Sequence, residues 1–177
     1  MITIKKAKIT KENTLEVSYT EGSNEITLKC KNEVHKDMRE AFKALIPHLA
    51  ILCDLKEAYK FMATEEARKQ FADSLDIKIM PEEKDLFQLH SLSVQGFAIG
   101  GDAEFEGLVL TGQKKIGKKV LCLNTPFTKW SDEYEPYKFI TQLSKAIDLC
   151  IDEIKLYLGG KANPPVQQKL ELEPEQL

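Results

Sequence analysis

The clearest candidate for binding chemistry is a group of four lysines around one predicted turn, followed closely by a fifth lysine and a tryptophan. The six residues are Lys114, Lys115, Lys118, Lys119, Lys129 and Trp130. Ammonium groups neutralise phosphates and an exposed aromatic ring stacks on bases, so this combination is typical of sequence-tolerant binding to single-stranded nucleic acid. The alternative is that the lysines protect a hairpin tip and a sheet edge, while Trp130 packs on the last helix.

The four lysines lie in a predicted three-strand meander over residues 87–126. Turn residues at 100–102 (GGD) separate its first two strands, and residues 115–118 (KIGK) separate the second from the third. Residues 108–110 (LVL) and 120–123 (VLCL) are apolar without alternation, which predicts that both faces of the sheet are covered there.

The rest of the chain predicts the elements that carry this meander. Residues 2–9, 14–20 and 25–31 alternate with a period of two, which indicates an antiparallel sheet with one solvent-exposed face. Apolar residues at helical spacing follow at 34–60 and again at 134–159, and Pro47 predicts a kink or break near 44–46. We therefore expect an α+β fold, with antiparallel strands in a βββα-βββα order and two long helices packed on the sheet. The expected core includes Leu49, Leu52, Leu110, Leu121, Ile147 and Ile151.

The domain organisation follows from the same patterns. Residues 1–160 are expected to form a single α+β domain that carries a charged insertion at 63–86, in which Thr64 caps a short helix. Residues 161–177 contain three prolines and no helical or strand period, so we expect a flexible C-terminal tail.

Composition narrows the function classes. The net charge of −3 gives no bulk attraction to nucleic acid, so a polyanion binder must concentrate its positive charge locally. No apolar run approaches the ~20 residues of a membrane span, and the start (MITIKKAKIT) lacks the apolar block of a signal peptide, so we expect a cytoplasmic protein without membrane contact. The oligomeric state is left open.

Residue types that could carry out catalysis or hold a cofactor are present, but they lack the spacing that such sites require. The four cysteines form no Cys-x-x-Cys pair, and the three histidines offer no zinc-ligand partner. The glycines at 96–107 match neither phosphate-binding fingerprint, and no serine lies in a nucleophile elbow. We therefore expect no enzyme activity, no metal site and no cofactor.

The tail contains one short motif. Gln167, Leu170 and Leu172 fit the pattern Gln-x-x-Leu-x-Leu, which resembles the peptide that bacterial replication proteins dock into the hydrophobic pocket of the sliding clamp. The motif lacks the terminal phenylalanine often present in such peptides. It predicts the sliding clamp as a partner of the tail.

The second half of the chain resembles a group of phage proteins. The stretch VQGFAIGGDAEFEGLVLTGQKKIGKKVLCLNTPF, the helix ending IDEIKLYLGGKA and the Gln/Leu-containing tail are similar to small uncharacterised proteins encoded by phages and prophages. The resemblance spans roughly residues 90–172. It implies a role in replication or recombination in the host cell cytoplasm, and it carries over no binding residues.

Two functional hypotheses remain. The first is a non-catalytic phage-type accessory protein of DNA replication or recombination, which binds single-stranded DNA through the sheet and the lysine-rich hairpin. The second is a protein-interaction or host-defence-blocking module that binds a protein or a small ligand, a role suited to the charged 64–86 segment and the peptide-like tail. Salt dependence distinguishes the two, because phosphate contacts release counterions.

Overall fold

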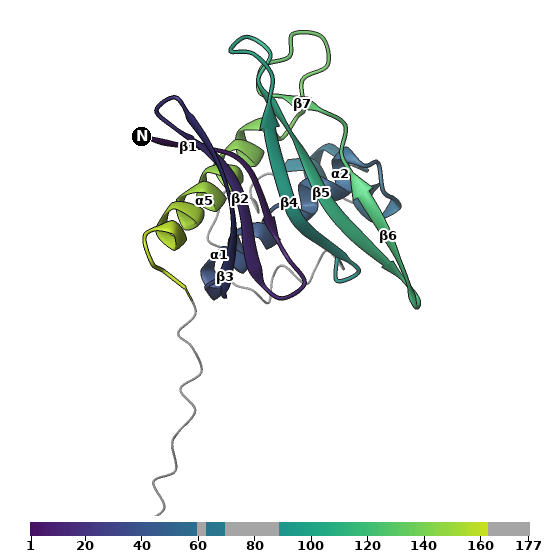
Figure 1. The fold of residues 1–177 in the computed structure, drawn as a ribbon. Helices are drawn as coiled ribbons and strands as arrows, with labels where there is room; N and C mark the ends of the chain where they lie inside the picture. Colours follow the sequence, from purple (N-terminus) through teal and green to yellow (C-terminus); the bar gives the residue numbers. More distant parts are fainter. Residues whose placement is uncertain (60–62, 70–88, 163–177) are drawn as a thin grey trace, which may run out of the picture.

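The computed structural model describes residues 1–59, 63–69 and 89–162, and its strands form one antiparallel sheet with helices on one face (Figure 1). The strands are β1 (Ile2–Ile9), β2 (Thr14–Glu21), β3 (Asn24–Glu33), β4 (Leu92–Gly100), β5 (Gly107–Ile116), β6 (Lys119–Asn124) and β7 (Thr128–Lys129). The helices whose bounds lie within the described residues are α1 (Lys36–Lys43), α2 (Ile46–Leu52), the short 3-10 helix η1 (Lys56–Ala58) and α5 (Ile140–Leu158). The sheet order is β3-β2-β1-β4-β5-β6, and β7 pairs with β5.

The expected α+β class and antiparallel sheet are confirmed, but the two long helices are not. In place of one helix over 34–60, the chain forms α1 and α2, which meet at Ala44 and Leu45. Pro47 lies in the first turn of α2, where its missing N–H would have no helical partner, so the break falls just before it. The last helix begins at Ile140 rather than near 134, and the second half adds the two-residue strand β7. Only α5 is long.

The core lies between the sheet and the helices. Leu49, Leu110 and Ile147 are buried as expected, and Leu52 and Ile151 are partly buried against the same core. Leu121 was expected there but is 48% exposed. The expectation that both faces are covered at residues 120–123 is also wrong, because β6 is an edge strand and an apolar run does not distinguish an edge from the centre of a sheet.

The alternation along β5 shows which face is covered. Leu108 and Leu110 are fully buried on the helix side, whereas Val109 and Thr111, on the opposite face, are partly exposed. Gly112 continues the buried series, and a Cβ atom there would overlap the side chain of Leu49. Helix α2 therefore packs directly on the backbone of β5.

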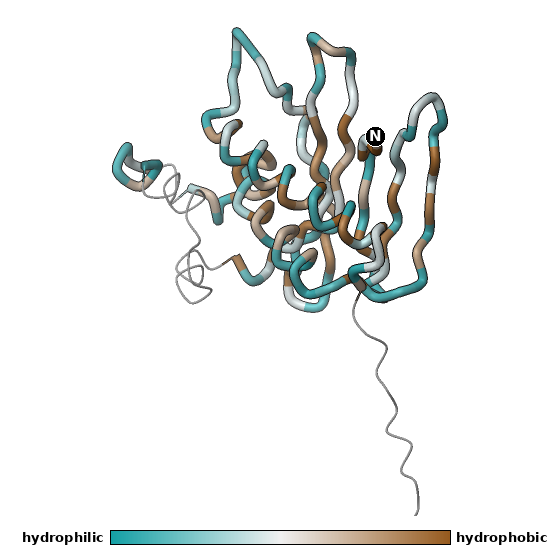
Figure 2. Tube along the Cα trace, turned by 90° about the vertical axis from the view of Figure 1, so that its left-hand side faces the viewer, coloured by the Kyte–Doolittle hydropathy of each residue, from teal (hydrophilic) through white to brown (hydrophobic). Residues whose placement is uncertain are grey.

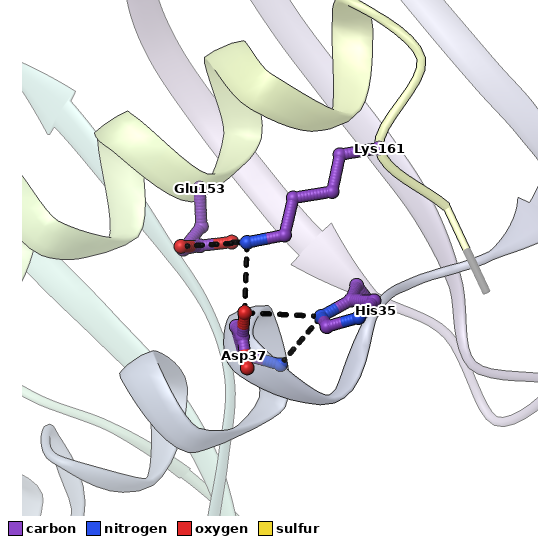
Figure 3. A network of polar contacts seen from close by, with 4 residues as sticks. All are labelled: His35, Asp37, Glu153 and Lys161. Atoms are coloured by element: carbon purple, nitrogen blue, oxygen red, sulfur yellow. Dashed lines mark hydrogen bonds and ion pairs between the residues drawn. The ribbon is translucent and has the colours of Figure 1, made fainter.

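A polar network joins the end of α5 to the start of α1 (Figure 3). Lys161 Nζ lies 2.8 Å from Asp37 Oδ2 and 2.9 Å from Glu153 Oε2, and His35 Nδ1 accepts a hydrogen bond from the backbone N–H of Asp37. The contact lowers the pKa of Asp37 and raises that of Lys161. Ala162 then forms a β-bridge with Val34, so the chain reaches residue 162 beside the end of β3.

Several expectations concern other segments. In the charged 63–86 segment, Thr64 Oγ1 accepts a hydrogen bond from the N–H of Ala67 at 3.0 Å, which agrees with its expected role as a cap. Residues 70–86 and the tail from 163, with Gln167, Leu170 and Leu172, lie outside the described residues. Within the described ranges, no helix has the length and apolar character needed to cross a bilayer.

Candidate nucleic-acid interface

No element of the described residues covers the face of the sheet opposite the helices; we call it the outer face. Figure 2 shows the helices on one side of the strands only. The outer face carries mostly polar or small side chains, as the register shows: Lys6 lies between Ser18 and Ala98, and Lys8 lies between Glu16 and Gly96. A face with no packing role can vary in chemistry without affecting the core, so it is the natural place to look for a binding surface.

Lys114 does not belong to the outer face. It lies an even number of residues from Leu108 and Leu110 along β5, so its side chain points to the same side as theirs, the helix side. There its Nζ lies 2.5 Å from Glu57 Oε1, and each side chain is only about one-sixth exposed, at 15% and 16%. The hydrogen bond from Lys114 lowers the pKa of Glu57. This ion pair attaches η1 to the sheet.

Lys115, Lys118 and Lys119 lie at the tip of the β5–β6 hairpin, and all three are exposed. Gly117, with φ of +60°, is the first residue of the two-residue turn, a position that favours glycine. Lys115 lies an even number of residues from Val109 and Thr111 along β5, so its side chain extends from the outer face as theirs do. Within the described part of the chain, none of the three lysines forms an ion pair.

Lys129 and Trp130 lie at the other end of β5. Strand β7 places Lys129 opposite Gly107, the first residue of β5, whereas the lysine tip follows its last residue. Because β5 is 10 residues long, about 30 Å separates the two ends. Trp130 is only partly exposed and packs against the core. The structure therefore does not bring Trp130 together with the four hairpin lysines.

Two exposed phenylalanines, which the sequence analysis did not single out, lie beside Lys129. Phe105 is 55% exposed and Phe127 is 47% exposed. The Lys129 ammonium lies 5.2 Å from the centre of the Phe105 ring, a cation–π contact. Lys129 faces outward with its partner Gly107, and Phe127 lies two residues earlier in the exposed link between β6 and β7. Phe105 and Lys129 are in contact at one end of the outer face, and we refer to them together with the nearby exposed Phe127 as the phenylalanine patch.

Acidic residues surround this end of the molecule. The connections on either side of the patch carry Asp102, Glu104, Glu106, Asp132, Glu133 and Glu135. The Asp132 carboxylate accepts hydrogen bonds from the N–H groups of Tyr134 and Glu135, which lower its pKa and fix the local turn. Between these acids, Tyr134 is 93% exposed.

One histidine is buried. His48 is fully buried, and its Nδ1 lies 2.9 Å from the hydroxyl of Tyr137. Burial lowers the pKa of His48 to about 3, so the ring is neutral near pH 7. Its Nε2 has no hydrogen-bond partner in the part of the chain that the structure describes. Because solvent does not reach the ring, His48 belongs to the core and not to a surface site.

The described residues provide no metal centre: no group of three or more histidine, cysteine or acidic side chains lies close enough there to hold an ion. Comparison with protein-family models, with curated proteins and with solved structures gives no match to this chain.

Proposed function

We propose that the protein is a non-catalytic, phage-type accessory protein of DNA replication or recombination that binds single-stranded DNA along the outer face. The observation that carries this proposal is the outer face itself, which has an exposed phenylalanine patch at one end and, at the other, exposed lysines with no ion-pair partner among the described residues. Lys6 and Lys8, both exposed on β1, lie on the central part of the same face. Single-strand binders combine these two kinds of side chain.

Each part of the face has a separate chemical role. Bases stack on Phe105 and Phe127, which contributes about 1–3 kcal/mol per base, while Lys129 lies beside the rings to contact a phosphate. From there the DNA strand follows β5 toward Lys115 and the hairpin tip. Between the two ends, the outer face of β4 carries no large side chain at Gly96 and Ala98, which pair with Lys8 and Lys6 of β1.

This assignment changes the residue set expected from the sequence. Lys115, Lys118, Lys119 and Lys129 are retained, and the phenylalanines take the stacking role expected of Trp130. Lys114 is omitted because its charge is already neutralised by Glu57. The chain is acidic overall, with a net charge of −3, so binding relies on local charge and is strongest at low salt.

Fluorescence anisotropy of a labelled single-stranded oligonucleotide tests the proposal. Changing Lys115, Lys118 and Lys119 to glutamate is expected to abolish binding at low salt. The matched control changes three exposed lysines of the helix side to glutamate, Lys36, Lys56 and Lys155, and is expected to retain binding because these charges lie away from the outer face. Absence of binding by the unaltered protein, or equal losses in both triple variants, contradicts the proposal.

A second variant and its matched control test whether the phenylalanines stack on bases. Phe105→Ala combined with Phe127→Ala is expected to weaken binding at least tenfold, since loss of one stacked base costs about 1–3 kcal/mol. Tyr59, 57% exposed beside η1 on the helix side, provides the control, and Tyr59→Ala is expected to leave binding unchanged. If the double phenylalanine variant binds as tightly as the control, the rings have no part in binding.

A second function is favoured by the acidic segment around Tyr134. A fully exposed tyrosine between Asp132, Glu133 and Glu135 suits a protein-interaction module that binds a basic segment of another protein. Titration with an arginine-rich peptide, monitored by anisotropy, separates the two functions. If a Tyr134→Ser variant loses peptide binding but keeps oligonucleotide binding, the peptide binds at this segment. If the variant keeps both, the segment is not the peptide-binding site.

The sliding clamp also stays a proposed partner, on the sequence of the tail alone. The test is retention on an immobilised bacterial clamp, comparing the intact chain with a variant in which Gln167, Leu170 and Leu172 are all alanine. Equal retention of the two proteins rejects docking through this motif.

A further inference from the structure

The two edges of the sheet differ in how they meet solvent. Strand β3 forms one edge, where Glu25, Lys29 and Lys31 are exposed charges, and Ala162 pairs with Val34 just beyond its end. Strand β6 forms the other edge. Charged side chains protect an edge strand from pairing with another chain, whereas an apolar edge invites such pairing.

Strand β6 has the unprotected composition. Val120 is 52% exposed and Leu121 is 48% exposed, and the adjoining Cys122 is also exposed. Lys119, its first residue, is the strand's only charged side chain. Along the rest of β6, no charged side chain of the strand discourages a second strand from pairing there.

The backbone groups available for such pairing can be identified. Ile116 and Lys119 close the two-residue turn, so they form a hydrogen-bonded pair, and such pairs recur at every second residue of the ladder. At the other end of β6, the N–H of Thr125 donates to the carbonyl of Leu110 at 3.0 Å, which continues the same pattern of a hydrogen-bonded pair at every second residue. The odd-numbered residues therefore bond to β5. The N–H and C=O groups of Val120, Cys122 and Asn124 point away from the sheet.

We propose that β6 is an interface between two copies of this chain, which pair β6 with β6 in antiparallel orientation about a two-fold axis at Cys122. In this register Cys122 lies opposite Cys122 of the second copy, Val120 opposite Asn124, and Leu121 opposite Leu123. All three outward-pointing residues are used, giving about six backbone hydrogen bonds. The apolar pair lies on the helix side, and the outer faces of both copies share one side of a continuous sheet.

Charge complementarity favours a second copy as the occupant. Strand β6 begins at the lysine tip and ends near the acidic connections around the phenylalanine patch, at opposite ends of the molecule (Figure 1). Antiparallel pairing brings Lys118 and Lys119 of each copy beside residues 125–127 of the other, next to those acidic connections. The two lysine tips are thereby kept apart. A parallel arrangement would place like charges together.

The inference does not depend on what the outer face binds. A six-residue edge is smaller than a standard protein–protein interface, so the dimer is expected to dissociate on dilution and in high salt. Analytical ultracentrifugation over a concentration series measures this directly. A mass that rises from one chain toward two is expected. A mass of one chain at every concentration overturns the proposal.

A matched pair of variants locates the interface. Val120→Lys places a charge on the edge and is expected to keep the protein monomeric, with an unchanged circular dichroism spectrum. Leu156→Lys alters a residue of α5 with nearly the same exposure, 50% against 52%, and is expected to dimerise like the unaltered chain. If Val120→Lys still dimerises, or if Leu156→Lys alone becomes monomeric, the interface lies elsewhere.

A disulfide between Cys122 of the two copies would test the position of the two-fold axis. Residues in a hydrogen-bonded antiparallel pair have Cα atoms about 5.5 Å apart, within the range that a disulfide spans. Diamide, which takes up the two protons and two electrons released when two thiols join, is expected to give a linked dimer on a non-reducing gel. Cys122→Ser is expected to abolish that band, and Cys53→Ser, at a partly buried thiol, to leave it. A linked dimer that persists in Cys122→Ser contradicts this register.

Discussion

The two faces of the sheet have different roles. On the helix side, alternate residues of the strands are almost completely buried, and they pack against α1, α2 and α5. On the outer face, the alternate positions carry lysine, serine, threonine and glutamine in contact with water. The backbone is the same for both faces, so the difference comes entirely from which residue type stands at each position.

This difference separates stability from binding. Apolar burial on the helix side stabilises the fold, so substitutions there are expected to change the free energy of unfolding. Substitutions on the outer face remove little packing, and their effects are expected in binding.

The largest difference is expected between Leu110 and Ser93. Leu110 is fully buried on β5, so Leu110→Ala removes buried surface and leaves a cavity, with a loss of about 2–5 kcal/mol in the free energy of unfolding. Ser93 is exposed on the outer face of β4, and Ser93→Ala is expected to change stability by less than about 0.5 kcal/mol. Urea denaturation measures both. Equal effects would show that the faces are not divided as described.

Two glycines give the next comparison. A methyl group at Gly112 would overlap the Leu49 side chain and the carbonyl of Ser93, so Gly112→Ala is expected to cost about 1–3 kcal/mol through overpacking. At Gly100, the last residue of β4, a methyl group meets no atom within 4 Å. Gly100→Ala is therefore expected to be close to neutral. If thermal unfolding shows Gly112→Ala to be as stable as Gly100→Ala, α2 does not pack on β5 in this way.

A pH dependence is expected from the helix side. The pKa of His48 is lowered from 6.5 to about 3 by burial, so below pH 6.5 the unfolded chain binds a proton that the folded chain does not. Stability is therefore fully present above pH 6.5 and falls by about 1.4 kcal/mol per pH unit as the pH drops toward 3. Denaturation curves between pH 7 and 4 are expected to lose this contribution in His48→Gln. An unchanged slope in that variant would show that the histidine is not buried in neutral form.

Local patterns in the sequence predicted much of the fold. The period of two located the first three strands, and Pro47 predicted the break between α1 and α2. Lys114 was wrongly assigned to the binding lysines, although its spacing from Leu108 and Leu110 along the strand was a signal in the sequence for the buried side. Local pattern was sufficient wherever the determining contacts lie nearby in the chain.

The remaining features depend on pairing between distant segments. The contact of β1 with β4 joins the two halves of the sheet, and no local signal shows that β6 lies at the edge. The contact between Lys129 and Phe105 exists because β7 returns to the first residues of β5, which places Lys129 on the outer face. Trp130, one position past Lys129, falls on the opposite side and packs against the core.

The central claim is that the outer face binds single-stranded DNA while the helix side maintains the fold. Ultraviolet cross-linking of a bromouridine-containing single-stranded oligonucleotide, followed by mass spectrometry of the peptides, tests this most directly. The expected result is cross-linking at Phe105 and Phe127, which decreases as salt is raised. Cross-links confined to Tyr59 on the helix side or to Tyr134 in the acidic segment, or no cross-links at low salt, would contradict it.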